Sequence, residues 1–301
     1  MSRAGAEARA RARHLWLGFE TIHAVTYFHP TCLDAITAAG AKGFWMGYFA
    51  ARMAPMGAIG PETATAVCFG FAPSRPARAL PDAWAYVEPA TAIEVRATSA
   101  AAALRLAVPD VDERAAAVVA TAEHLVEGLV PAGRPLGAGN LGVDLGAAGD
   151  DPVARLWQAC TALREHRGDG HVAAWVAAGC TGLEANVLSC AAADRDPEDL
   201  LASRGWSPVE WLLATTALHA RGLLATPASS GGGALAARAT DAGRAVHDHV
   251  EETTDALAAA TYTAVGTRAL EDLATALVSM GADVTASGAL RYPNPIGLPP
   301  A

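Results

Sequence analysis

The segment GCTGLEANVLSC at residues 179–190 has an earlier counterpart in GAIGPETATAVC at residues 57–68, and both follow the pattern G-x-x-G-x-E-x5-C. The same offset, without a gap, aligns WAYVE at 84–88 with WSPVE at 206–210. Agreement of the rarer residue types, Cys and Trp, in one frame indicates an internal duplication. We therefore expect two related halves.

The composition fits two halves of ordinary size. The chain has 301 residues, of which 52% are apolar and 18% charged, so it can bury a sizeable core and is not expected to be disordered. Ala and Leu outnumber Val and Ile, which favours helices. We expect a mainly α protein with halves at 1–130 and 151–301, and a linker rich in Gly and Ala at 131–150.

The cysteine usage and the net charge indicate the cellular location and the class of partner to expect. The five cysteines are an odd number without C-x-x-C spacing, which predicts neither a disulfide framework nor a zinc finger and favours a cytoplasmic location. No uncharged run reaches the roughly 18 residues of a membrane span, and the arginine-rich start is not a signal peptide. The net charge of −9 opposes non-specific attraction to nucleic acid.

The second half has the clearer helix signals. Asp151-Pro152 predicts the start of a helix that runs to about residue 164, a loop at 165–170 interrupts it, and the helix resumes at 171–178. Further helices are expected at 184–192 and 198–203. Ser207-Pro208 then begins a helix that reaches about residue 221, and a Gly-rich loop precedes a long helix that ends near residue 257.

That succession resembles the MarR-type winged helix-turn-helix. The resemblance implies that residues 207–220 form the helix that reads DNA and that about 224–240 form the wing, while the first half is a degenerate copy with a wing reduced to 108–112. Taken whole, GFWMGYFAAR at 43–52, LREHRGDGH at 163–171 and YPNPIGL at 292–298 resemble an actinobacterial family of tandem winged-helix proteins. This second resemblance implies a fold and no particular chemistry.

The residues available for DNA contact are poorly suited to it. A reading helix needs polar side chains for base edges and Lys or Arg for phosphates. The helix at 207–220 offers Glu210, which would repel phosphate, and Lys42 is the only lysine in the chain. A MarR-type dimer holds its effector between the dimerisation helices and the winged domains. We therefore expect a small-molecule ligand between the halves of a pseudo-dimeric monomer or a homodimer, with ligand-responsive DNA binding as the alternative.

Polar residues concentrate at positions 164–171, which predicts one wall of a ligand site. Glycines there would let backbone N–H groups approach an anion, two arginines could grip it, and a histidine could serve as acid or base. An exposed turn whose charges satisfy one another is the alternative. The candidate catalytic residues are His171, Asp169 and Glu165, and the candidate ligand-binding residues of this wall are Arg164, His166 and Arg167.

An aromatic helix in the first half supplies the expected opposing wall. Trp45, Tyr48, Phe49 and Arg52 are the candidates, with ordinary core packing as the alternative. Two further candidates, Glu62 and Glu184, are equivalent under the duplication. They are either paired site carboxylates or residues that open helices.

No metal site is expected. His247 and His249 are two residues apart and point to different sides of a helix, and His29 and Cys32 lack a third ligand nearby. The sequence contains no phosphate-binding loop with the required strand and helix around it. A haem or other tetrapyrrole held by a lone histidine stays open, as do the identity of the ligand and whether a reaction follows binding.

Overall fold

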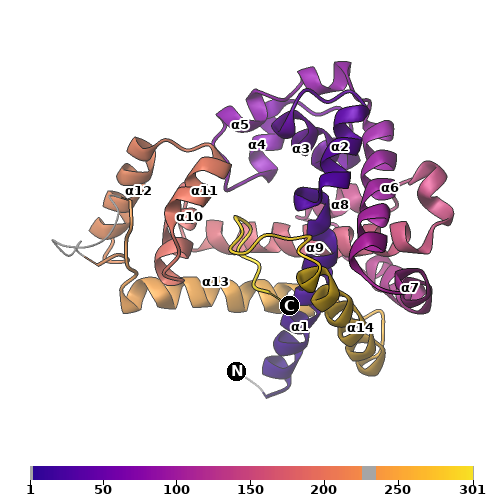
Figure 1. Ribbon diagram of the computed structural model, residues 1–301. Coiled ribbons are helices and arrows are strands. Elements are labelled where there is room, and N and C mark those ends of the chain that lie inside the picture. The colour runs from indigo at the N-terminus through magenta and orange to yellow at the C-terminus, as the bar shows by residue number, and fades with distance from the viewer. Residues whose placement is uncertain (1–2, 226–234, 301) are drawn as a thin grey trace.

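The computed structural model describes residues 3–225 and 235–300, and its regular structure is helical (Figure 1). Within these two ranges the strand-like pairing consists of one isolated antiparallel bridge, between Leu224 and Ala239. The α-helices are α1 (Arg3–Phe28), α2 (Pro30–Ala38), α3 (Phe44–Met53), α4 (Pro61–Val67), α5 (Ser74–Ala77), α6 (Pro89–Ala107), α7 (Val111–Glu127), α8 (Pro135–Asn140), α9 (Pro152–Ala177), α10 (Gly182–Ala192), α11 (Pro197–Arg204), α12 (Pro208–Ala220), α13 (Asp241–Ala259) and α14 (Thr267–Ala286). Short 3-10 helices are η1 (Ala54–Met56), η2 (Asp82–Ala85) and η3 (Gly146–Asp150).

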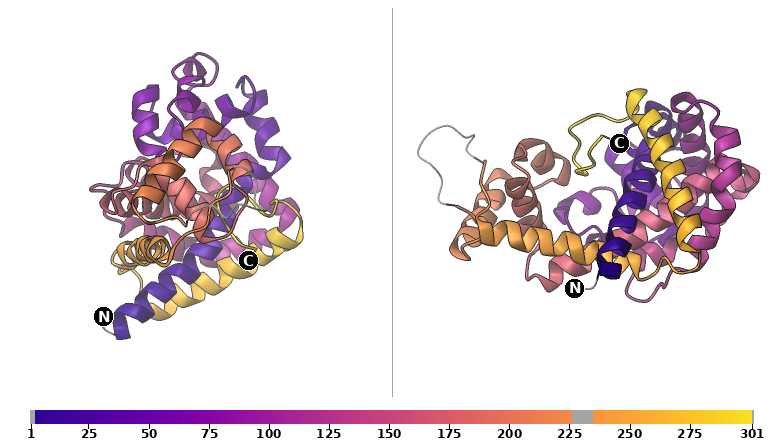
Figure 2. Two further views of the ribbon diagram at one scale, coloured as in Figure 1. Left: turned by 90° about the vertical axis from the view of Figure 1, so that its left-hand side faces the viewer. Right: turned by 90° about the horizontal axis from the view of Figure 1, so that it is seen from below.

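Helix α9 is the centre of the molecule and contacts α1, α6, α7, α8 and α13. Its first part packs in the main core, where Leu156, Trp157 and Leu163 are buried among residues of α1, α6, α7 and α14. Its last turns place Ala174 and Trp175 in a second core with α10 and α12. Figure 2 shows α1 and α14 side by side, with α13 leading from them to α10–α12.

The predicted interruption of this helix at 165–170 is wrong, because α9 continues through it. Two glycines in a helix interior cost about 1 kcal/mol each relative to alanine, and tertiary packing routinely outweighs that cost. Here glycine permits close approach: the Arg134 guanidinium lies where a side chain at Gly170 would be. On α8, a Cβ at Gly137 would lie 2.8 Å from the His166 Cα.

Helices α10, α11 and α12, followed by the Leu224–Ala239 bridge and α13, cover the segment expected to fold as a helix-turn-helix, and we refer to them as the helix-turn-helix unit. Reciprocal capping boxes start two of its helices, Thr181 with Glu184 at α10 and Ser207 with Glu210 at α12. Gly205, at φ +81°, ends α11 in the left-handed conformation that glycine adopts without strain. The bridge lies at the base of the predicted wing, whose tip at 226–234 falls outside the described residues.

The first half also has two short helices followed by a longer one, α4, α5 and α6, but the duplication stays a prediction. Of its predicted wing at 108–112, residues 108–110 are a short turn between α6 and α7, and residues 111–112 belong to α7. The segment at 131–150 forms α8 and η3, and α8 packs on α9 with Leu136 and Asn140 buried. None of the helices in the described ranges has the length and hydropathy of a membrane span.

Candidate ligand site

The Glu165 carboxylate, 1% exposed, is the centre of an ion-pair network between α9 and α3. Arg52 donates from Nε and Nη2 to its two oxygens at 3.0 and 3.1 Å, and Arg164 donates from Nη1 at 2.8 Å. Burial alone would raise the pKa of Glu165, but Arg164 and Arg52 outweigh it and hold that pKa well below its usual range. Arg164 also binds Glu20 of α1 at 3.2 Å.

The predicted opposing wall divides between this network and the core beneath it. Arg52 donates from Nη1 to the Tyr48 hydroxyl at 2.9 Å, so both residues belong to the network. Phe49 is fully buried, and Trp45 packs with it against Phe71. The network thus joins predicted site residues from both halves of the chain.

A cavity of about 30 Å³ lies beside Glu165, between α1, α2, α3, α6 and α9. This volume holds roughly one or two water molecules or a ligand of a few non-hydrogen atoms. It is far too small for a tetrapyrrole. Its lining residues include the following: His23, Tyr27, Tyr48, Arg52, Arg96, Trp157, Thr161 and Glu165.

Three buried polar atoms of the lining residues have no hydrogen-bond partner within the described part of the chain: His23 Nε2, Tyr27 Oη and Arg96 Nε. His23 Nδ1 lies 2.9 Å from Thr161 Oγ1, whose own proton is donated to the Trp157 carbonyl. The His23 proton is therefore on Nδ1, and Nε2 carries a lone pair. Burial, followed by the Arg164 charge, lowers the pKa of His23 well below its usual value.

Arg96 is a buried cation whose hydrogen-bond partners among the described residues are all neutral. Its Nη1 donates to the Ala51 carbonyl at 3.1 Å, and Nη2 donates to Asn140 Oδ1 and Gln158 Oε1, each at 2.9 Å. The guanidinium also lies over the Trp157 ring. Burial lowers the pKa of Arg96 to about 10, because desolvation disfavours its charged form.

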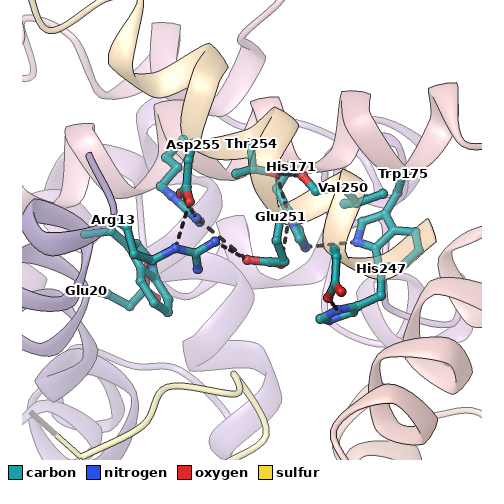
Figure 3. Close-up of polar contacts among 12 residues, drawn as sticks. Arg13, Glu20, His171, Trp175, His247, Val250, Glu251, Thr254 and Asp255 are labelled. Carbon is teal, nitrogen blue, oxygen red and sulfur yellow. Dashed lines mark hydrogen bonds and ion pairs between the residues drawn. The ribbon is translucent and has the colours of Figure 1, made fainter. Parts of the chain in front are cut away.

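A second polar cluster, on another face of α9, joins it to α1 and α13 (Figure 3). Arg167 donates to Asp255 at 2.8 Å, and Arg13 donates to both Asp255 and Glu251. His171 lies nearby, with Nδ1 3.0 Å from Thr254 Oγ1 and Nε2 accepting from the Trp175 indole at 2.9 Å. The charges in this cluster satisfy one another.

His166 and Asp169 face a third direction, toward α8 and the segment before it. His166 Nε2 lies 2.9 Å from the Val130 carbonyl, and Asp169 accepts from the Gly137 backbone N–H at 2.8 Å. Burial raises the pKa of Asp169 to about 6. The helical geometry thus separates the polar residues at 164–171, and of these eight only Glu165 lines the cavity.

Glu62 and Glu184 do not line the cavity. Glu184 closes the capping box of α10 and lies 3.4 Å from Arg221, while Glu62 stands in the first turn of α4. In the described ranges no three His, Cys, Asp or Glu residues are grouped to hold a metal ion. His29 caps α2 through the Thr31 backbone N–H.

Sequence reasoning missed His23, Tyr27, Arg96 and Thr161. A usable signal existed for the first two, because they are one helical turn apart in an apolar stretch and so share a face. Arg96 and Thr161 reach the cavity only through the packing of α6 and α9 on α1, which no local pattern encodes.

A family model described as a helix-turn-helix family matches residues 12–291. No match was found among curated proteins or among solved structures.

Proposed function

The chain belongs to this helix-turn-helix family, and on that premise we propose that it is a small-molecule-binding protein whose ligand occupies the cavity beside Glu165. The observation that carries the proposal is that three residues lining one cavity each have a buried polar atom without a partner among the described residues: His23 Nε2, Tyr27 Oη and Arg96 Nε. An unsatisfied buried polar group costs about 1–3 kcal/mol, so three at one place favour a polar guest.

The position of the cavity supports the same proposal. It lies where α9 meets the helices of the first half, and α9 continues from there into the core of the helix-turn-helix unit. Occupancy of the cavity would therefore act on a helix that both regions share. The proposal includes no catalytic step, since both His171 ring nitrogens already have protein partners.

Ligand-responsive DNA binding is the second candidate, and family membership favours it. The side chains of α12 argue against DNA binding. Its sequence contains one charged side chain, Glu210, and its exposed face presents Val209 and Leu213, which are 67% and 66% exposed. Residues 178–260 contain five arginines against eleven carboxylates, a net charge of −6 that would repel phosphate.

The test of ligand binding compares two buried tyrosines whose hydroxyls both lack a hydrogen-bond partner among the residues that the structure describes. Tyr27 lines the cavity and Tyr262 does not. Native mass spectrometry of the purified protein and thermal-shift titration with a panel of small acids, amides and alcohols should identify a compound that stabilises the protein. We expect Tyr27→Phe to reduce that shift and Tyr262→Phe to preserve it. A panel without effect, or equal effects in both variants, would reject the cavity as the site.

A separate measurement tests ligand-responsive DNA binding. Fluorescence anisotropy with duplexes from upstream of the coding sequence, with and without the stabilising compound, should show no sequence-specific binding at about 0.15 M salt, where few phosphate contacts give little affinity. Specific binding that the compound releases would establish the second candidate instead.

A further inference from the structure

We propose that the ligand of this cavity is a short carboxylate, of the size of formate or acetate, which binds together with one proton shared with His23. This inference rests on the proposed function and specifies the chemistry of the same site. It follows from the charges around the cavity, the donors and acceptors of the residues that line it, and its size.

The charges around the cavity do not balance. Glu165 is neutralised by Arg52 and Arg164, and Glu20 by Arg164, so three arginines including Arg96 accompany two carboxylates. Within the described residues Arg96 has only neutral oxygens as partners. Glu165 acts on Arg96 only as a neighbouring charge, and a buried cation without a directly bonded anion is expensive, so a carboxylate oxygen placed against Arg96 gains an interaction that it lacks.

The unpartnered atoms specify more than charge. Arg96 Nε–H can only donate, the Tyr27 hydroxyl can donate or accept, and His23 Nε2 can only accept in the neutral tautomer that Thr161 fixes. A carboxyl group matches all three, because one oxygen accepts from Arg96 and Tyr27 while the other shares a proton with Nε2. A halide has a single atom and cannot accept from Arg96 and Tyr27 with one atom while a second holds the His23 proton, and an amide carries no negative charge.

Proton uptake follows from the groups that face His23. These are Tyr27 on its own helix, Arg52 of α3, Arg96 of α6, and Arg164 and Glu165 of α9. Burial and the three arginines together outweigh Glu165 and keep the empty site's imidazole neutral. A carboxylate against Nε2 reverses that balance, so the anion and one proton enter together. The apparent dissociation constant should then rise about tenfold per pH unit above the pKa of the free acid.

The cavity volume limits the chain length. About 30 Å³ leaves room for the carboxyl group and at most one further atom, and Gly47 and Ala51 of α3 form part of the wall. A larger side chain at Ala51 would fill this space. Ala51→Leu should therefore abolish binding, and Tyr27→Phe provides a second variant if the larger residue unfolds the protein.

The experiment is isothermal titration calorimetry of the full chain with formate, acetate, glycolate and acetamide at pH 6, 7 and 8. Repeating each titration in buffers of different ionisation enthalpy gives the number of protons taken up on binding. We expect a carboxylate to bind with uptake of one proton and acetamide not to bind. His23→Gln should remove the pH dependence. The matched control is His166→Gln, which alters a buried histidine that also has one unpartnered ring nitrogen but does not line the cavity.

The outcomes separate the two proposals. If a neutral compound binds in a manner sensitive to Tyr27→Phe while carboxylates do not, the ligand site stands and its assignment to carboxylates is overturned. Carboxylate or chloride binding without proton uptake also overturns the inference. If nothing binds and Tyr27→Phe behaves like Tyr262→Phe in every titration, the proposed function fails as well.

Discussion

The indole N–H of Trp175 donates a hydrogen bond to His171 Nε2 at 2.9 Å, one turn apart on α9 (Figure 3). An indole can only donate, so Nε2 must carry a lone pair and the imidazole proton must be on Nδ1. Thr254 Oγ1 accepts that proton, because its own hydroxyl donates to the Val250 carbonyl. His171 is therefore a neutral structural link between α9 and α13.

This link should make stability sensitive to acid. Burial is the main cause that lowers the pKa of His171 to about 4, below the ordinary value near 6.5. A depressed histidine pKa means that the folded state binds the proton less well than the unfolded state. The stabilisation is thus complete above about pH 6.5 and is lost as pH falls toward 4.

We expect His171→Gln to lower the melting temperature at pH 7.5. At pH 4.5 the melting temperatures of the variant and the unmodified protein should lie closer together. Thermal unfolding followed by circular dichroism measures this. His124→Gln, which alters a histidine with a 60% exposed side chain on α7, is the control. A constant difference across the pH range would contradict the assignment.

Asp169, two residues earlier, should affect the pH dependence of stability in the opposite sense from His171. Its pKa is raised to about 6 by burial, so the folded state favours the protonated carboxyl, and folding becomes less favourable as pH rises from about 4 through 6. Asp169→Asn keeps an acceptor for the Gly137 N–H and removes the charge. Urea unfolding should show a gain on the order of 1–2 kcal/mol at pH 7.5 and almost none at pH 4. A loss of stability at pH 7.5 would show that the charge itself is needed.

Removing the ion pairs of Glu165 should cause a large loss of unfolding free energy. Glu165→Gln leaves Arg52 and Arg164 buried without their shared carboxylate, and breaking a buried pair in this way costs about 3–5 kcal/mol. Glu7→Gln removes a carboxylate whose exposed pair with Arg3 is expected to contribute at most about 1 kcal/mol. Equilibrium urea unfolding compares the two, and similar losses would contradict the role of the network.

Local signals predicted much of the fold and little of the site. Proline and capping residues at Asp151, Thr181 and Ser207 indicated helix starts because they act within one turn. Gly168 and Gly170 misled the prediction for α9, since their cost is local and the packing that offsets it comes from α8 and α13. Arg52 and Glu165 were both candidates, but their pairing over 113 residues of sequence separation is a tertiary fact.

The face of α12 should tolerate polar substitution. Leu213 is 66% exposed, so Leu213→Gln removes little buried area and should change the unfolding free energy by less than about 0.5 kcal/mol. Trp211→Phe on the opposite face removes a buried indole that donates to the Leu235 carbonyl and should cost more. Chemical denaturation of both variants checks the contrast. A large loss for Leu213→Gln would mean that this face packs on something in solution.

Helix α9 supplies buried side chains to both the main core and the core of the helix-turn-helix unit, and Gly168 and Gly170 lie between the two contributions. The angle between the regions therefore depends on how straight the helix stays at its least stiff turn. A change of curvature at that turn would displace α12 by more than the groups around Glu165, because α12 lies farther from the turn along α9.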